Sequence, residues 1–321
     1  MRTKLLLRLL FLSIFFSVLC ISCSKDNDDD IQPKKETPQK NTAQDDEKGM
    51  IRLYKVNGED ISKSKDYKVS GTNKKYQTDQ KKHKQMWKLT KNVIPRKQRK
   101  MLVEFLIFNG EDNDGTAGWV TQTTEDLTEW QMGLAIDYAF DQNNNFNADG
   151  EFAYTVIHEF GHILSLNNSQ VDPTIKDAAS SKTYFNEEGS AREKSYLHKI
   201  YKKFWADIYE EYKEASKNED DHQAFYEKYK DRFVTQYAST NPEEDIAEVF
   251  AYFVTQKEKP TGNSMANQKI KMLYEYKELM EIRDYIRKKN NLKSATTEGL
   301  ILPEPGSWKN ANTIGDPKRR K

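Results

Sequence analysis

Residues 151–166 read EFAYTVIHEFGHILSL, and this stretch predicts a helix that is buried within the fold. A helix on the surface of a protein carries one apolar stripe, whereas here apolar residues recur around much of the circumference. The apolar positions are Phe152, Val156, Ile157, Phe160, Ile163 and Leu164. Asn167 and Asn168 follow and predict the end of the helix. We therefore expect other elements to pack around it.

The same helix carries His158, Glu159 and His162 in the pattern HExxH. Residues four apart face one side of a helix, with about 5–6 Å between their Cβ atoms. The two imidazoles can therefore bind one zinc ion, at about 2.1 Å each. Glu159 is offset from that face and can reach a water on the metal without binding the metal. Since zinc lowers the pKa of such a water to about 7 and a glutamate can take its proton, the motif predicts a zinc-dependent hydrolase with Glu159 as base.

The chain offers few histidines for such a motif to arise by accident. With five histidines and 50 acidic residues, even the looser pattern His-acid-x-x-His occurs by chance about one time in a hundred. The alternative is a core helix whose two histidines have separate polar partners, but one metal ion would satisfy both. The other histidines lie in highly charged segments, where we expect surface residues rather than ligands: His83, His198 and His222.

A catalytic zinc site usually takes a third ligand from the protein. One class places a histidine six residues after the second histidine, but Asn168 stands at that position, so this class is excluded. The alternative is a glutamate on a later helix, and residues 241–250, NPEEDIAEVF, offer Glu244 and Glu248 on one helical face. Glu244 also stands three residues after Asn241, where a capping-box glutamate belongs. Helix geometry leaves Glu244 and Glu248 open as the third ligand.

Residues 237–250, YASTNPEEDIAEVF, resemble the corresponding segment of zinc proteases of the anthrax lethal factor type, which also carry HEFGH. The resemblance covers the two motifs and not the chain between them. It implies that Glu244 is the third zinc ligand and that Glu248 is a nearby supporting carboxylate. It also implies that Tyr237 points at the oxygen on the metal and acts as an electrophilic catalyst. The alternative for Tyr237 is a packed core tyrosine.

The rest of the chain predicts an α+β fold, with strands first and helices later. Short apolar runs predict strands at residues 101–108, 119–121 and 131–137, and a polar loop is expected at residues 143–150. Helices are expected at residues 85–100, at 190–230 as two charged helices broken near 218–221, at 241–256 and at 267–288. Asn241 and Pro242 predict the N-cap and the first position of the helix at 241–256. Residues 300–321 are expected to be loop.

The N-terminus predicts a targeting segment. A basic start and an apolar run from Leu9 to Ile21 have the size of a signal peptide and are short for a membrane span. Cys23 follows Ser22, which predicts a lipoprotein signal at residues 1–22 with lipid attached to Cys23; the alternative is an ordinary secretory signal. Residues 23–49 are acidic and polar and predict a disordered tether. The chain has two cysteines, Cys20 and Cys23, so neither a disulfide in the domain nor a cysteine-rich zinc site is expected.

Several of these features together resemble the zinc metallopeptidase lipoproteins of Bacteroidetes. The resemblance covers most of residues 23–321 and includes the lipid-box cysteine, the acidic tether, the Trp87–Pro95–Arg96 region, the Trp130 strand, HEFGH and the later EDIAE. It implies a zincin-like metallopeptidase domain at residues 50–321, with a small mixed sheet and a helix-rich C-terminal half. It also implies an outer-membrane lipoprotein that faces the cell surface, partnered by a nutrient importer. The acidic run at residues 24–30 resembles a surface-export signal.

The expected activity is peptide-bond hydrolysis with one Zn²⁺ ion and a peptide or protein substrate. Strand 131–137 is expected to line the cleft and pair with an extended substrate. One alternative is a substrate-binding accessory of an importer with weak or no peptidase activity, and another is hydrolysis of a non-peptide amide or ester. The net charge of +1 predicts no bulk attraction to nucleic acid, and the membrane is reached through the lipid anchor only.

Overall fold

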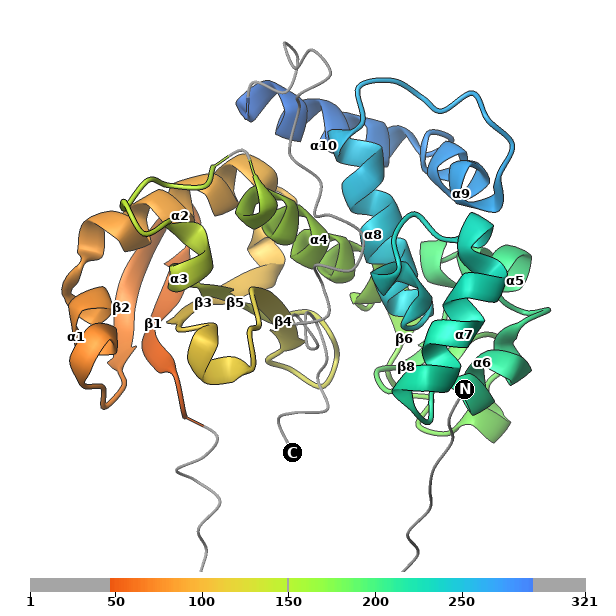
Figure 1. The fold of residues 1–321 in the computed structure, drawn as a ribbon, viewed down its shortest axis with the longest axis horizontal. Coiled ribbons are helices and arrows are strands. Elements are labelled where there is room, and N and C mark those ends of the chain that lie inside the picture. Colours follow the sequence, from red (N-terminus) through yellow and green to blue (C-terminus); the bar gives the residue numbers. More distant parts are fainter. Residues whose placement is uncertain (1–46, 149, 291–321) are drawn as a thin grey trace, which may run out of the picture. The chain divides into compact units, whose positions relative to one another are not determined.

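Figure 1 shows the computed structural model, in which residues 47–148 and 150–290 are described. The main sheet has five strands in the order β2-β1-β3-β5-β4. β3 and β5 pair in parallel, and the other neighbours pair antiparallel. The sheet is therefore mixed, with β2 and β4 at its edges. The strands are β1 (Met50–Asn57), β2 (Asp60–Asp66), β3 (Leu102–Phe108), β4 (Gly118–Gln122) and β5 (Trp130–Ala135).

The strands predicted near residues 101–108 and 119–121 are confirmed as β3 and β4. The strand predicted at 131–137 ends earlier, at Ala135, because the short helix α3 (Ile136–Ala139) follows directly. The hairpin of β1 and β2 was not predicted. β2 reads DISKSKD and is almost wholly exposed, so it lacks the apolar alternation that marks a strand with one buried face. Charged residues on such an edge strand disfavour pairing with another chain.

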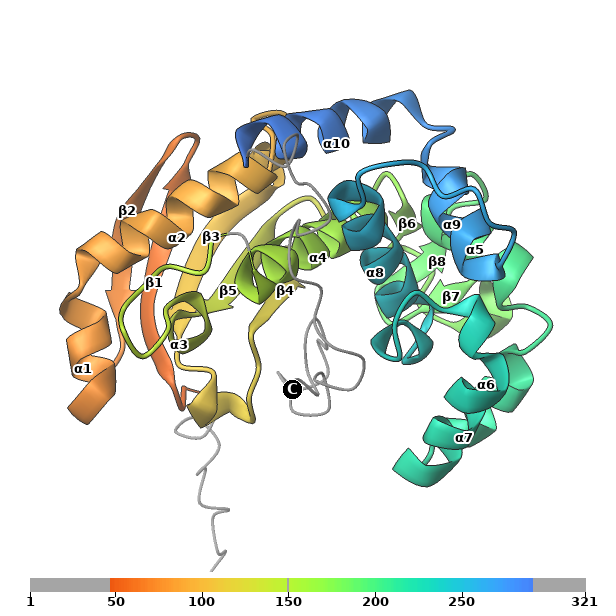
Figure 2. The same ribbon diagram turned by 45° about the horizontal axis from the view of Figure 1, so that its top comes forward.

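The central strand β3 separates two apolar layers. Phe105 and Ile107 belong to the large core on the face that carries the helices, whereas Leu106 and Phe108 belong to a small cluster on the other face. This follows from the period of two along a strand. Figure 2 shows α2 (Gln80–Val93) and α4 (Glu151–Leu166) on the same side of the sheet.

The predicted buried helix is confirmed as α4, in which every residue except Glu151 is buried. It lies between the main sheet and α8 (Pro242–Thr255). Asn241 caps α8 as predicted, and its side chain accepts a hydrogen bond from the backbone N–H of Glu244. The two helices approach closely at Gly161, where a Cβ atom would lie 3.0 Å from the Cα of Ala247.

Three helix boundaries differ from the predictions. The helix expected at 85–100 ends at Val93. A proline disfavours the helical conformation of the residue before it, and Ile94, which precedes Pro95, is extended. Residues 190–230 form three helices rather than two, and 267–288 forms two rather than one. These are α5 (Tyr196–Phe204), α6 (Tyr209–Ala215), α7 (Glu219–Tyr229), α9 (Met265–Leu273) and α10 (Lys277–Lys289).

The additional breaks occur at buried or half-buried aromatic residues that the charged pattern does not distinguish. Trp205 ends α5, and its indole N–H reaches Asp245 of α8 at 2.7 Å. Tyr276 is extended between α9 and α10, and its hydroxyl accepts a hydrogen bond from Lys199 at 2.7 Å. Tertiary contacts therefore decide where these helices stop.

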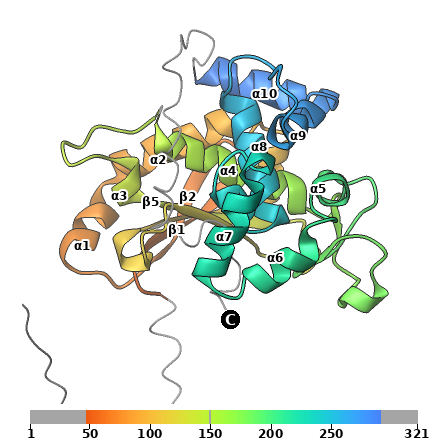
Figure 3. The same cartoon turned by 45° about the vertical axis from the view of Figure 1, so that its right-hand side comes forward.

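Helix α10 lies across the C-terminal end of α8 (Figure 3). Arg283 donates to the backbone carbonyl of Phe253, and Arg287 donates to those of Val254 and Thr255. The last carbonyls of a helix have no partner within it, so these arginines satisfy them. The C-terminal half of the described chain is thus rich in helices, and the fold class is α+β with a small mixed sheet.

The remaining elements are short. A second sheet has the order β6-β8-β7, and α1 follows the first hairpin. Every helix within 47–148 and 150–290 is too short or too polar to cross a membrane. The predicted signal peptide, the predicted lipidation site Cys23, the predicted tether up to residue 46 and the loop expected at 300–321 lie outside the described residues. The bounds are α1 (Gly71–Thr78), β6 (Val171–Asp172), β7 (Phe185–Asn186) and β8 (Gly189–Ala191).

Candidate metal site

Three side chains from α4 and α8 meet between the two helices. The Nε2 atoms of His158 and His162 lie 3.1 Å apart, and Glu244 Oε2 lies 3.1 Å from the first and 3.3 Å from the second. All three residues are buried. The group could hold a metal ion, and its members are three of the residues that the sequence predicts as ligands.

The spacing of these atoms fits a tetrahedral metal. Ligand atoms at about 2.1 Å from zinc in tetrahedral directions lie about 3.4 Å from one another. Two imidazole nitrogens and one carboxylate oxygen are also a ligand set that zinc accepts, with a fourth position left for water or substrate. The three atoms, which all lie within 4.8 Å of one another, are therefore spaced as ligands of one tetrahedral metal ion would be.

Glu248 faces Nδ1 of His158, whereas Glu244 faces Nε2. Its Oε1 lies 2.7 Å from Nδ1 of His158, and its Oε2 accepts hydrogen bonds from Tyr154 at 3.0 Å and Thr235 at 2.6 Å. Because a carboxylate can only accept, the Nδ1–H of His158 donates to it. In the neutral ring the lone pair is then on Nε2, which faces Glu244 and His162, and this is the tautomer that a metal ligand needs.

Glu159 is fully buried, and neither of its carboxylate oxygens has a hydrogen-bond partner among the described residues. Burial raises its pKa to about 8; Glu244 and Glu248 also raise it, and His158 lowers it. A buried carboxylate without a partner is expensive. It is the state expected of a proton acceptor that faces a substrate or a water rather than another side chain.

His158 and Glu244 shift each other's pKa. Burial alone would lower the pKa of His158, but hydrogen bonds to Glu244 and Glu248 raise it to about 10. Burial would raise the pKa of Glu244, but His162 and His158 lower it to about 2. These directions describe the side chains alone, and a dication among them would favour neutral imidazoles and an ionised carboxylate.

Tyr237 lies beside the metal group, in the short 3₁₀ turn before α8. Its ring centroid is 5.8 Å from that of His158. Burial raises its pKa well above 10, the carboxylates of Glu244, Glu159 and Glu248 raise it further, and its hydroxyl hydrogen-bonds to Glu244. The phenol therefore keeps its proton at neutral pH and can donate it in a hydrogen bond.

The structure brings together all the predicted site residues that lie in its described part. Glu244 is not used as a capping-box residue through its carboxylate, which is turned toward the histidines instead. Sequence reasoning missed Tyr154 and Thr235, the two hydroxyl partners of Glu248. Tyr154 could have been found, since it stands four residues before His158 on the same helical face.

The prediction that the other histidines are surface residues was wrong for two of them. His83 is buried, with Nδ1 2.7 Å from the hydroxyl of Tyr54. His198 is buried, and its Nδ1 accepts from the backbone N–H of Tyr184. His222 is partly exposed. Both buried histidines have protein partners, and they stand in charged segments because their helices bury one face.

The expected substrate strand also changes. β5 lies between β3 and β4, so both of its edges are paired and it cannot pair with a substrate. The edge strand next to the site is β4. A Cβ atom on Gly118 would lie 2.8 Å from Thr155 and 3.3 Å from Cγ of Glu159, so the backbone of β4 passes directly beside Glu159.

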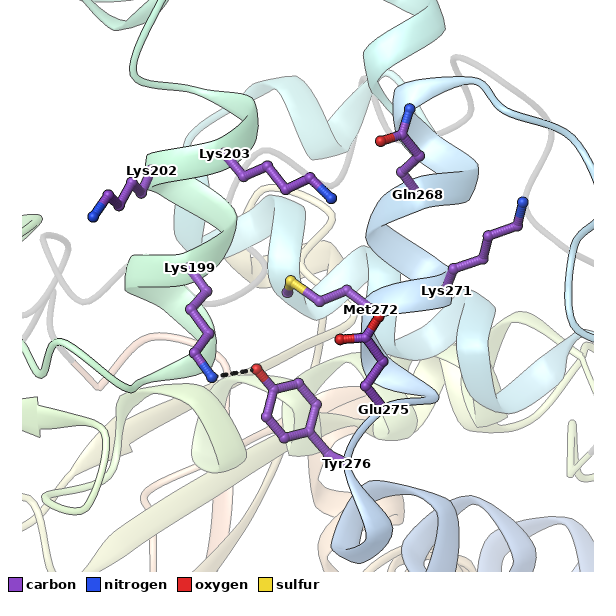
Figure 4. A pocket seen from close by; sticks show the side chains of 8 residues that line it. All are labelled: Lys199, Lys202, Lys203, Gln268, Lys271, Met272, Glu275 and Tyr276. Atoms are coloured by element: carbon purple, nitrogen blue, oxygen red, sulfur yellow. Dashed lines mark hydrogen bonds between the residues drawn. The ribbon is translucent and has the colours of Figure 1, made fainter.

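A cavity of about 630 Å³ lies elsewhere, between α5 and α9 (Figure 4). In the figure Lys203 reaches across it toward Gln268, and Lys199 points to Tyr276. Lys271, at its rim, donates to the backbone carbonyl of Gly262. The lining contains none of the residues of the metal group. Its residues are Lys199, Lys202, Lys203, Gln268, Lys271, Met272, Glu275 and Tyr276.

No family model, no curated protein and no solved structure matches this chain.

Proposed function

We propose that this chain is a zinc-dependent hydrolase with a zincin-like fold, and that its substrates are peptides. The observation that carries the proposal is the convergence of His158, His162 and Glu244 beside the unpartnered carboxylate of Glu159. Zinc rather than another metal is favoured by the two imidazoles and by the tetrahedral spacing. Magnesium and calcium prefer sites built from oxygen ligands alone.

When bound, zinc would polarise the substrate carbonyl and lower the pKa of a water. Glu159 is the base that takes the proton of the attacking water and later delivers it to the leaving amine. Tyr237 donates a hydrogen bond to the oxygen of the carbonyl on which negative charge develops. Glu248 holds the ring of His158 in orientation through Nδ1.

A peptide is the favoured substrate because an edge strand passes beside the base. An extended peptide can add to such an edge through main-chain hydrogen bonds, independently of its side chains. We propose β4 for this role. Gly118 lets the strand approach Glu159, so a peptide on β4 would present its backbone to the catalytic groups.

The setting proposed for this activity is the outer membrane of a bacterium of the Bacteroidetes. The chain would be held through lipid on Cys23, would face the cell surface and would work beside a nutrient importer. The support is the sequence of the N-terminus and the resemblance of most of residues 23–321 to the zinc metallopeptidase lipoproteins of Bacteroidetes. Metabolic labelling with a fatty acid, compared with a Cys23→Ser variant, tests the anchor. Protease access on intact cells tests its orientation.

The test of the enzyme is metal content followed by cleavage of a peptide library, with wild type and Glu159→Gln compared. We expect one zinc per chain in both proteins and turnover that is about 10²–10⁴-fold lower in the variant. Zinc without turnover by the wild type on any peptide would contradict a peptidase and favour a substrate-binding accessory. Turnover of amide or ester compounds but not of peptides would move the substrate class. Full turnover by Glu159→Gln would remove Glu159 as the base.

A further inference from the structure

The first turn of α8 carries three carboxylates in succession: Glu243, Glu244 and Asp245. Successive residues of a helix are about 100° apart around its axis, so each of the three faces a different direction. A small rotation of α8 would therefore turn Glu244 away from the histidines, and a rotation of about 100° would put a neighbouring carboxylate in its place. The identity of the ligand depends on what holds α8 in its present orientation.

Each carboxylate has its own partners. Glu243 accepts a hydrogen bond from the hydroxyl of Tyr184 at 3.1 Å, and Glu244 faces the two histidines. Asp245 Oδ2 lies 2.5 Å from Nζ of Lys269 and 2.7 Å from Nε1 of Trp205. The three acids are thus sorted among three different environments.

The partnership of Asp245 is unusual because it is completely buried. Asp245, Lys269 and Trp205 are all 0% exposed. The ammonium of Lys269 lies 4.6 Å from the ring centroid of Phe233 and 5.7 Å from that of Phe204. Among the described residues, Asp245 is the one carboxylate within ion-pair distance of Lys269.

A buried ion pair is a poor choice if stability alone is the aim. The desolvation of two charges offsets most of their attraction, and replacement by apolar residues of similar volume is often neutral or stabilising. What the pair adds over an apolar contact is direction, because two charge-assisted or polar donors from different segments converge on one oxygen, Oδ2 of Asp245. The donors come from α9 and from the residue that follows α5, and both α5 and α9 pack on α8.

We propose that Lys269 and Trp205 are positioning residues for the metal site. By holding Asp245, they fix the rotation of α8 at which Glu244, and not one of its acidic neighbours, faces His158 and His162. The packing around Lys269 also leads toward Glu248. Phe233, whose ring contacts the ammonium of Lys269, stands two residues before Thr235, and Thr235 donates a hydrogen bond to Glu248. This inference rests on the proposed metal site and is independent of whether the substrate is a peptide.

The test replaces the pair by apolar residues of similar size, in the double variant Asp245→Leu/Lys269→Met. Zinc affinity is measured by competition with a chromophoric chelator, the geometry of the site by the visible spectrum of the Co²⁺ form, and stability by urea unfolding of the metal-free protein. We expect the urea midpoint to stay at or above that of the wild type. We expect the Kd for zinc to rise about 10–100-fold, as for other groups that orient metal ligands, with an altered Co²⁺ spectrum.

The matched control is Arg52→Met/Asp66→Leu, which removes a 2.5 Å ion pair from the β1–β2 hairpin. We expect it to change the urea midpoint but to leave zinc affinity within twofold of wild type. If the first double variant does not fold, Trp205→Phe removes a single hydrogen bond to Asp245 and keeps an aromatic ring. A smaller loss of zinc affinity in the same direction is expected there.

Zinc affinity and a Co²⁺ spectrum equal to wild type in Asp245→Leu/Lys269→Met, or in Trp205→Phe where that variant is needed, would overturn the inference. The inference would also be overturned if the double variant lost zinc affinity together with urea stability and the control lost zinc affinity in the same proportion to its own loss of stability. Failure of the wild type to bind zinc would overturn the proposed metal site instead. The two failures are therefore distinguishable.

Discussion

Replacement of Glu248 by glutamine tests whether Glu248 orients a ligand of the proposed metal site or is itself a ligand. The structure places Glu248 Oε1 2.7 Å from Nδ1 of His158, whereas Glu244 Oε2 lies among the Nε2 atoms. Glu248→Gln keeps the volume and one acceptor for His158 but removes the charge. It also turns an amide donor toward the hydroxyls of Tyr154 and Thr235, which in the wild type donate to Oε2 of Glu248.

The magnitude follows from these contacts. Loss of a charged partner of a metal-ligating histidine weakens metal binding about 10–100-fold, or by about 1.4–2.7 kcal/mol. In the metal-free protein, a buried hydroxyl that loses its acceptor lowers the free energy of unfolding by about 1–3 kcal/mol. Glu244→Gln removes a ligand itself, and we expect its zinc affinity to fall by more than about 100-fold, beyond the range of an orienting residue.

The assay is competition for zinc with a chromophoric chelator at neutral pH, with urea unfolding of the metal-free proteins. Glu243→Gln is the matched control, because it removes a carboxylate from the same turn of α8 that faces Tyr184 and not the histidines. We expect it to bind zinc within threefold of wild type. The reverse order, with zinc binding abolished in Glu248→Gln and nearly retained in Glu244→Gln, would refute the assignment of the third ligand. An unchanged affinity in Glu248→Gln would refute its orienting role.

Three further predictions concern catalysis, packing and pH. Tyr237→Phe should lower peptide turnover about 10²–10³-fold with zinc affinity changed less than tenfold; equal turnover would leave Tyr237 a packing residue. Gly161→Ala places a Cβ 3.0 Å from the Cα of Ala247, and the cost of moving α4 and α8 apart should exceed the roughly 1 kcal/mol that alanine gains over glycine in a helix. The free energy of unfolding, measured in urea, should therefore fall by about 1–2 kcal/mol; an unchanged or raised midpoint would show that the two helices accommodate the methyl group at little cost. Burial chiefly, with a contribution from Arg52, lowers the pKa of His83 from 6.5 to about 4. Between pH 6.5 and 4 the unfolded chain therefore binds a proton at His83 that the folded chain does not bind, and the free energy of unfolding should fall by up to about 3 kcal/mol as pH drops through this range. His83→Gln should flatten this part of the plot of stability against pH, and a slope equal to that of the wild type would exclude His83 as its source.

Local patterns in the sequence determined the elements that carry the chemistry. Apolar residues around all sides of 151–166 predicted a buried helix, and HExxH set two histidines on one face of it. Asn241 and Pro242 determined where α8 begins. Such signals depend on neighbours within about one helical turn, so they can be recognised in the sequence without knowledge of the fold.

Tertiary structure alone decided which distant groups meet. The choice between Glu244 and Glu248 depends on which turn of α8 lies against the histidines of α4, because the two residues share a helical face and stand one turn apart along the axis. The place of β4 at the sheet edge, rather than β5, depends on pairing order, which alternation within a strand does not encode. The burial of Lys269 against Asp245 joins α9 to α8 across 24 residues, and the lysine has no local signal that separates it from the exposed lysines around it. These features come from packing between segments far apart in the chain, so they are decided by the complete fold.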